Sequence, residues 1–115
     1  MSRSPWKVKR FKKTVPASTA LSEVIAAPGA GFSILIRSLT LTVGGTATKT
    51  TLKSASTELE PPKENDANGG YILPPDNEGW LVCADNEAFN LTTDTGSTTY
   101  INGTYMIAPT NQISL

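Results

Sequence analysis

The stretch from Asn68 to Thr93, NGGYILPPDNEGWLVCADNEAFNLTT, alternates clusters of turn-forming residues with short apolar runs. Its Asn-Gly-Gly start favours a turn because glycine adopts positive φ at little cost, and Pro74-Pro75 ends the apolar run that follows. Two Asp-Asn pairs mark further turns. The apolar runs between these turns predict strands at 71–73, 80–83 and 88–93. Turn and strand alternating at this pitch indicate an antiparallel sheet.

The longest predicted strand covers residues 32–43, where apolar side chains recur at every second position. They occupy even positions as far as Ile36 and odd positions from Leu39 onward. A period of two that changes phase predicts a bulge, or a crossing from one sheet to the other, at Arg37-Ser38.

Shorter strands follow the same rhythm through the rest of the chain. They are predicted at 20–27, 46–53, 54–60 and 99–108, with a polar loop at 60–66. The last is either one bulged strand or a strand pair that turns at Asn102-Gly103. The 16 threonines and 10 serines favour strands and turns. We therefore predict an all-β fold: an antiparallel β-sandwich of jelly-roll type with about eight short strands.

Composition argues against several classes of protein. A length of 115 residues suits one domain. Because Cys83 is the single cysteine, the chain cannot form an internal disulfide, and we expect Cys83 to be a small buried hydrophobic residue. The sequence has no histidine, so it lacks the commonest general base and metal ligand. We expect no enzymatic activity, with no catalytic residue, no cofactor and no metal site. No apolar run is long enough to cross a membrane, and no signal peptide is predicted.

Charge divides the chain into two parts. Residues 1–13 carry six cations and no acid, whereas the remaining residues carry four cations and ten acids. We therefore predict a basic N-terminal arm at 1–13 and a single β-sandwich domain at 14–115. Aromatic side chains among the cations indicate that at least part of the arm packs against another surface. The positive charge of the arm would steer it to an acidic partner. The residues predicted to contact that partner are Trp6, Lys7, Lys9, Arg10, Phe11, Lys12 and Lys13.

Two alternatives to partner binding remain for the arm. The first alternative is that these residues form a first strand with solvated lysines, and the second is that they form a mobile terminus. Nucleic acid is disfavoured as the partner, because the acidic body adds no basic surface to the arm. Few charges guard the predicted strand edges of the body, so we also expect oligomerisation.

Two other groups of residues have open roles. The triplet Asp-Asn-Glu occurs at 76–78 and at 85–87, and four converging carboxylates would suit calcium or a pair of catalytic acids. Turn formation is the commoner role of such residues, and we favour it. Trp80 either stacks on a sugar ring, with Tyr71 or Tyr100 nearby, or anchors the core or a subunit interface, which we favour.

The order of these elements resembles that of a family of small tailed-bacteriophage virion proteins. The shared pattern spans about residues 24–108, so the arm lies outside it. It comprises an apolar strand, a Gly-Gly turn with apolar residues and proline, a Gly-Trp pair, an acidic residue before an Ala-hydrophobic-Asn-Leu strand, and a last aromatic strand. Here these are Phe32 to Leu41, Gly69 to Pro74, Gly79-Trp80, Glu87 to Leu91 and Gly103-Thr104-Tyr105.

The resemblance implies a virion component, and some such proteins are similar to trimeric capsid decoration (cement) proteins. We therefore expect a homotrimer on the virion's capsid surface, assembled in the host cytoplasm. It would bind the major capsid protein and stabilise the outer shell by non-covalent contacts, without a membrane. The alternative is a tail-fibre module of the virion that binds a receptor or carbohydrate.

Overall fold

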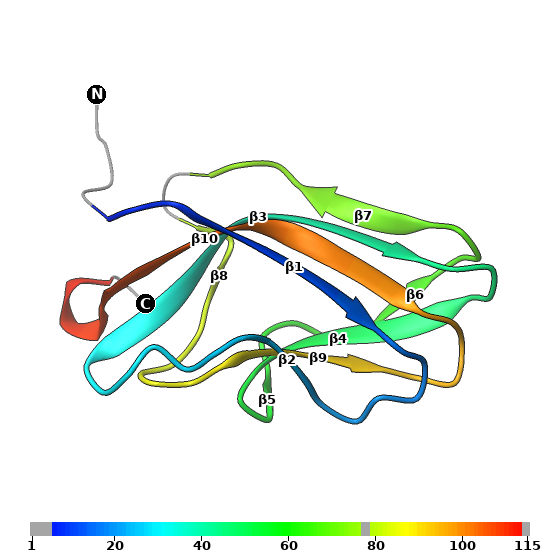
Figure 1. Cartoon of the computed structure of the whole chain (residues 1–115), viewed down its shortest axis with the longest axis horizontal. Coiled ribbons are helices and arrows are strands. Elements are labelled where there is room, and N and C mark those ends of the chain that lie inside the picture. The colour runs from blue at the N-terminus through cyan, green and yellow to red at the C-terminus, as the bar shows by residue number, and fades with distance from the viewer. Residues whose placement is uncertain (1–5, 77–78, 114–115) are drawn as a thin grey trace.

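The computed structural model describes residues 6–76 and 79–113. Almost all of the regular structure in these residues is β-strand, and a single 3₁₀ turn, η1, follows the last strand (Figure 1). The elements in chain order are β1 (Lys9–Val15), β2 (Ser22–Ile25), β3 (Phe32–Val43), β4 (Thr48–Ser54), β5 (Thr57–Glu58), β6 (Lys63–Asn65), β7 (Gly70–Leu73), β8 (Leu81–Val82), β9 (Phe89–Thr93), β10 (Thr99–Pro109) and η1 (Thr110–Gln112).

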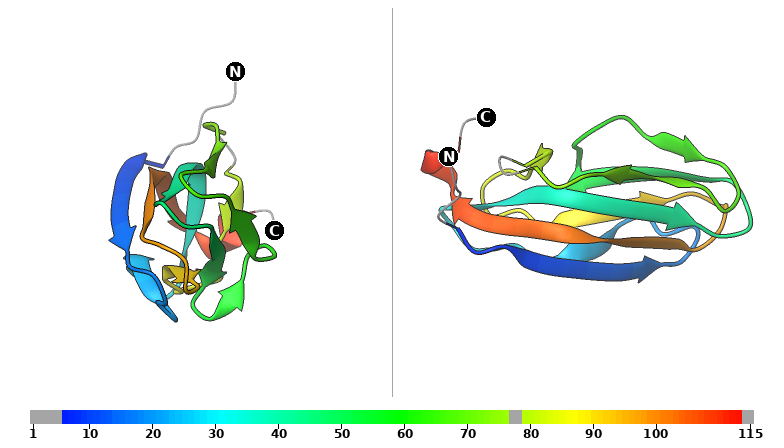
Figure 2. Two further views of the ribbon diagram at one scale, coloured as in Figure 1. Left: turned by 90° about the vertical axis from the view of Figure 1, so that its right-hand side faces the viewer. Right: turned by 90° about the horizontal axis from the view of Figure 1, so that it is seen from above.

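The strands form two antiparallel sheets that pack face to face (Figure 2). Sheet A has the order β1-β10-β3-β7, and β8 also pairs with β3. Sheet B has the order β2-β9-β4-β5, and β6 also pairs with β4. The predicted all-β sandwich is therefore confirmed.

The strand order is that of a jelly roll. When the two-residue strands β5 and β8 are set aside, eight strands remain, arranged as β1-β10-β3-β7 and β2-β9-β4-β6. The first of these strands pairs with the last and the second pairs with the second-last, so that the chain repeatedly crosses between the sheets. Two Greek keys wound in this way define the jelly-roll fold.

A bulge divides β3 where the sequence predicts one. Ser38 lies opposite Thr104 on β10, but Ile36 lies opposite Tyr105, so Arg37 has no partner on that strand. Along β3 the extra residue moves the inward-facing positions from even to odd numbers. Leu39 and the odd positions after it face the core on one side of the bulge, and Ile36 does so on the other.

The main core lies between the sheets and is entirely apolar apart from one thiol. Phe89 is fully buried there and meets Phe11 edge to face, with 5.9 Å between the ring centroids. The buried members are Phe11, Val15, Ile25, Ile34, Ile36, Leu39, Leu41, Val43, Leu52, Cys83, Phe89, Leu91 and Ile101.

A second, smaller cluster covers one end of the outer face of sheet A. Leu35, Met106 and Ala108 form its buried centre, and Leu35 lies between Ile34 and Ile36, which face the main core. Trp6 and Ile113, from opposite ends of the described chain, pack against it. The segments before β1 and after β10 therefore meet on the same face of the sheet.

The structure differs from the predicted layout at β6 and at the end of the basic segment, and it selects one of the two alternatives for the last strand. β6 lies within the predicted polar loop, where buried Asn65 donates hydrogen bonds to the Thr48 carbonyl and the Thr50 hydroxyl, both at 3.0 Å. β10 is one bulged strand, with Gly103 paired to Leu39 rather than turning. The boundary placed after Lys13 falls inside β1.

In the described part of the chain, none of the helical structure is long and apolar enough to cross a bilayer.

Candidate functional site

The basic segment forms an edge strand of sheet A. From Lys9 onward it pairs with β10 on one side, and no described strand pairs with its other side. Four of the seven residues of β1 are exposed cations, and within the described residues none of them forms an ion pair. Lysine and arginine at a free edge oppose pairing with foreign strands. The expectation of poorly guarded edges is therefore wrong for β1.

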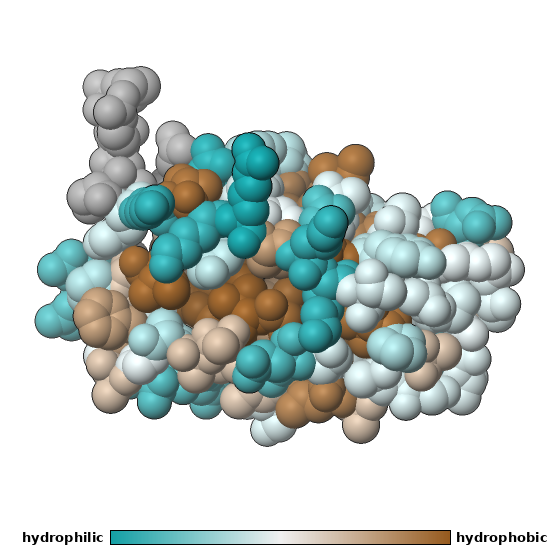
Figure 3. Space-filling view, viewed as in Figure 1, coloured by the Kyte–Doolittle hydropathy of each residue, from teal (hydrophilic) through white to brown (hydrophobic). Residues whose placement is uncertain are grey.

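Phe11, one of the residues predicted to contact a partner, lies in the main core. Its side chain is only 7% exposed, and its ring packs against both Phe89 and Tyr105. Figure 3 shows this side of the molecule, where hydrophilic side chains along β1 lie across an underlying hydrophobic area. The aliphatic stems of lysine and arginine can cover apolar surface in this way while their charges stay in water.

Trp6 also packs partly against its own chain. It is half-buried and packs against the cluster of Leu35, Met106 and Ala108. Among the predicted contact residues, those whose side chains are exposed are therefore the cations, namely Lys7, Lys9, Arg10, Lys12 and Lys13.

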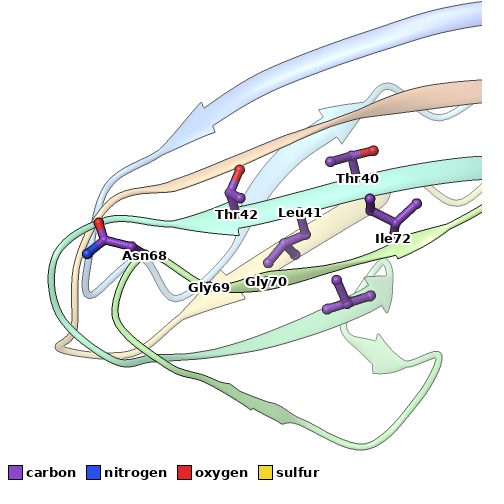
Figure 4. Close-up of a pocket in the computed structure, with 8 residues that line it drawn as sticks. Thr40, Leu41, Thr42, Asn68, Gly69, Gly70 and Ile72 are labelled. Carbon is purple, nitrogen blue, oxygen red and sulfur yellow. The ribbon is translucent and has the colours of Figure 1, made fainter.

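The outer face of sheet A carries residues that the sequence did not single out. Thr40 on β3 lies opposite Asn102 on β10 and opposite Ile72 on β7. Beside Ile72 there is a shallow hollow of about 370 Å³, and Figure 4 shows Thr40 and Ile72 together at it. A second hollow, of about 430 Å³, lies at the β1 end of the sheet, between Arg10 and Lys12. Thr40 lies between two apolar residues of β3, but the alternation of side chains along one strand does not identify its neighbours on other strands.

Trp80 is not a core residue, so that half of the interpretation we favoured is wrong, whereas its role at a subunit interface stays a prediction. Its side chain is 45% exposed, beside the short strand β8. The indole N–H donates to the Pro74 carbonyl, and the backbone N–H donates to the Ile36 carbonyl at 2.7 Å. These two bonds hold an exposed aromatic ring at the edge of sheet A. Of its two possible aromatic companions, Tyr100 is exposed, whereas Tyr71 packs against the main core.

The second acidic turn is occupied by internal hydrogen bonds. Asp85 accepts from the Thr110 hydroxyl at 2.6 Å, and Glu87 accepts from the Ser54 hydroxyl at 2.6 Å. In the first acidic turn, Asn77 and Glu78 lie outside the described residues. Among the residues that are described, no group of three or more metal-ligating side chains comes together.

Two buried groups have altered ionisation. Burial, reinforced by the negative charge of Glu87 and partly offset by a hydrogen bond with Ser54, raises the pKa of the Cys83 thiol to about 12. Burial and the nearby carboxylate of Glu60 raise the pKa of Tyr71 well above its usual value. A neutral, buried thiol is a poor nucleophile, so Cys83 is a packing residue.

The Cys83 thiol makes stability depend on pH in the alkaline range. Above pH 9, near the ordinary thiol pKa of 9.0, the unfolded chain loses this proton but the folded chain keeps it until about pH 12. The unfolded state then binds fewer protons, so the free energy of unfolding falls as pH rises. We expect the free energy of unfolding, measured by urea denaturation, to be about 1 kcal/mol lower at pH 10 than at pH 8. If the free energy of unfolding of the Cys83→Ala variant fell by the same amount between pH 8 and pH 10, the fall would not come from Cys83.

Comparisons with known proteins yield distant structural likenesses. No protein-family model matches the chain, and no curated protein matches it. The chain is similar to one from Bacillus endospore appendages, a family of disulfide-linked pili, with a TM-score of 0.48 and 8% identity over 95% of this chain and 94% of that one. It is also similar to a chain of the virus-like particle of extra small virus from the giant freshwater prawn Macrobrachium rosenbergii, with a TM-score of 0.44 and 7% identity over 93% and 82%.

Neither TM-score is high enough for the likeness to carry an argument about function. The resemblance to tailed-bacteriophage virion proteins therefore stays a prediction.

Proposed function

We propose that the protein is a structural component of a tailed-bacteriophage virion that decorates the outer capsid and stabilises it by non-covalent contacts. The observation that carries this proposal is the row of exposed cations on β1, which forms no ion pair within the described chain. A β-sandwich with such a row at its edge suits docking on an acidic protein shell. The partner would be the major capsid protein, which the sequence resemblance implies.

Docking would depend on both charge and repetition. Exposed cations steer a protein to an acidic surface, and salt weakens that attraction. Each contact is weak by itself, but several linked copies on a symmetric shell bind with avidity. The proposal therefore includes the homotrimer expected from the resemblance. Sedimentation of the purified protein tests it directly, since the chain has a mass of 12.2 kDa.

Capsid binding is expected to weaken about tenfold or more when Arg10 and Lys12 are both changed to glutamine. Each exposed charged contact contributes up to about 1 kcal/mol, so two of them account for this change, and avidity enlarges it. The measurement is co-sedimentation with tailed-phage capsid shells that lack a decoration protein, at low and at physiological salt. Deleting the whole arm would be a poor test because it removes β1 from the sheet.

Lys49→Gln with Lys53→Gln is the matched control, because it neutralises two cations on β4 of the other sheet. We expect this variant to bind as the wild type does. The proposal fails if no shell retains the wild-type protein, or if both double variants bind equally.

A second candidate function is favoured by the exposure of Trp80. The hydrogen bond from its indole N–H to Pro74 fixes the ring, and a fixed, exposed aromatic ring can stack on a sugar. A receptor- or carbohydrate-binding module of a tail fibre would use such a ring.

Under this second function, Trp80→Ala is expected to abolish binding in a glycan array while leaving the fold intact. Tyr100→Ala, which removes another exposed aromatic ring from sheet A, is the control. Absence of any glycan signal from the wild-type protein would remove this candidate.

A further inference from the structure

One continuous row of side chains crosses the outer face of sheet A. Strand pairing places Lys12 opposite Asn102, Asn102 opposite Thr40, and Thr40 opposite Ile72. All four alternate with residues that face the core, so their side chains point outward. Three strand spacings separate the ends of the row, so Lys12 and Ile72 are about 14 Å apart.

The two ends of this row differ in chemistry. At the β1 end, the hollow of about 430 Å³ is lined by Arg10, Lys12 and Asn102, and neither cation has a carboxylate partner among the described residues. At the β7 end, the hollow of about 370 Å³ lies beside Ile72, which is 68% exposed, more than any other large apolar side chain described. The β7 strand carries no charge to guard its edge.

We propose that this row is one docking surface for an extended segment of a partner protein. A carboxylate of that segment sits between Arg10 and Lys12, and a large apolar side chain packs beside Ile72. In an extended chain about 14 Å corresponds to four residues, so the recognised pattern is an acidic residue and an apolar residue four positions apart. Between them, the polar side chains of Asn102 and Thr40 can hydrogen-bond the segment's backbone.

Charge and polarity favour a protein segment over other occupants. A nucleic acid would match the cations of β1 but would present phosphates to the uncharged hollow beside Ile72. A segment that carries one charge and one apolar side chain satisfies both ends. The proposal deepens the proposed function, because a capsid protein would carry the segment, but its recognition chemistry can be tested without a capsid.

The test is a titration of the full-length protein, labelled with nitrogen-15, with the peptide Asp-Ser-Thr-Ser-Leu and its reverse, both with blocked ends. We expect one of them to shift backbone amide signals along the row, with binding in the millimolar range typical of so small a contact. Replacing the peptide's aspartate with lysine, or its leucine with serine, should abolish the shifts.

Variants of the protein locate the contact. Lys12→Gln and Ile72→Ser should each weaken peptide binding by about fivefold, as the removal of one modest interaction does. Lys49→Gln and Leu21→Ser, which change an exposed lysine of β4 and an exposed leucine beside β2, should have no effect. All four positions are exposed, and the dispersion of each variant's amide spectrum checks that it is folded.

Three results would overturn the proposal. One is the absence of amide shifts on this face with either peptide, and another is equal shifts with the lysine-containing peptide. The third is a shift of the same amides on simple dilution, which would assign the face to a second copy of the chain. Capsid binding that persists alongside any of these results would leave the proposed function standing without this recognition mode.

Discussion

Gly103→Ala is expected to lower the free energy of unfolding by about 3 kcal/mol, as steric overpacking in a well-ordered interior does. A Cβ at this position would lie 2.1 Å from the carbonyl oxygen of Ser38 and 3.0 Å from the Cα of Leu39. Both atoms belong to the backbone of β3, next to the bulge, so no side chain can rotate away. β10 or β3 would have to move, and the two strands share the longest pairing in the protein.

Gly45→Ala is the matched control for this prediction. No atom outside the neighbouring residues lies within 4 Å of a Cβ built at Gly45, which sits in the connection between β3 and β4. Its substitution should change the free energy of unfolding by less than about 1 kcal/mol. Urea denaturation followed by circular dichroism measures both variants. Similar values for the two would show that β3 and β10 adapt to the extra methyl group.

Phe11→Ala should cost about 3–4 kcal/mol of unfolding free energy, because it leaves a cavity in the main core. The ring packs against Phe89 and Tyr105, so its removal eliminates packing against both sheets. This is the effect expected of a core residue and not of an exposed anchor for a partner. Thermal or urea denaturation of the variant provides the measurement.

Phe32→Ala is the control, since Phe32 is also in a strand of sheet A but is 43% exposed. Its cost should stay below about 1 kcal/mol, as for most exposed positions. If Phe11→Ala kept wild-type stability and failed only to bind capsids, Phe11 would be a partner contact after all.

Sequence reasoning succeeded where local pattern and tertiary structure agree. The strand at 32–43 was predicted with its observed bounds, and the change of phase at Arg37-Ser38 predicted the bulge. Both signals come from side chains that alternate between an apolar core and solvent, which is the strongest local determinant of a strand. β6 was missed because Lys-Glu-Asn has no apolar residue to alternate.

The role of β1 was harder to predict because position at an edge changes the alternation. Phe11 and Val15 are buried, but Lys13, on the same side of the strand, reaches solvent past the rim of the sandwich. This interrupted alternation is similar to the residue pattern of a basic arm without regular structure. The exposure of Trp80 was unpredictable for a related reason, since a Gly-Trp pair before a strand suits a core position and an edge position equally.

The candidate docking row could not be predicted at all from local sequence. Its members come from four strands that are far apart in the chain, and their alignment depends on three separate pairing registers. A slip of one residue in any of these registers would turn that strand's side chains to the other face.

The position of the last strand has a consequence for how this protein folds. β10 lies inside sheet A, between β1 and β3, so that sheet cannot be completed until the chain has been synthesised as far as β10. Pairings between distant parts of a sequence make folding slow and leave strands exposed in the meantime. During that interval β1 has both edges open, and its cations repel other copies of the same strand. The charges that guard one edge of the finished protein thus protect the unfinished one from aggregation.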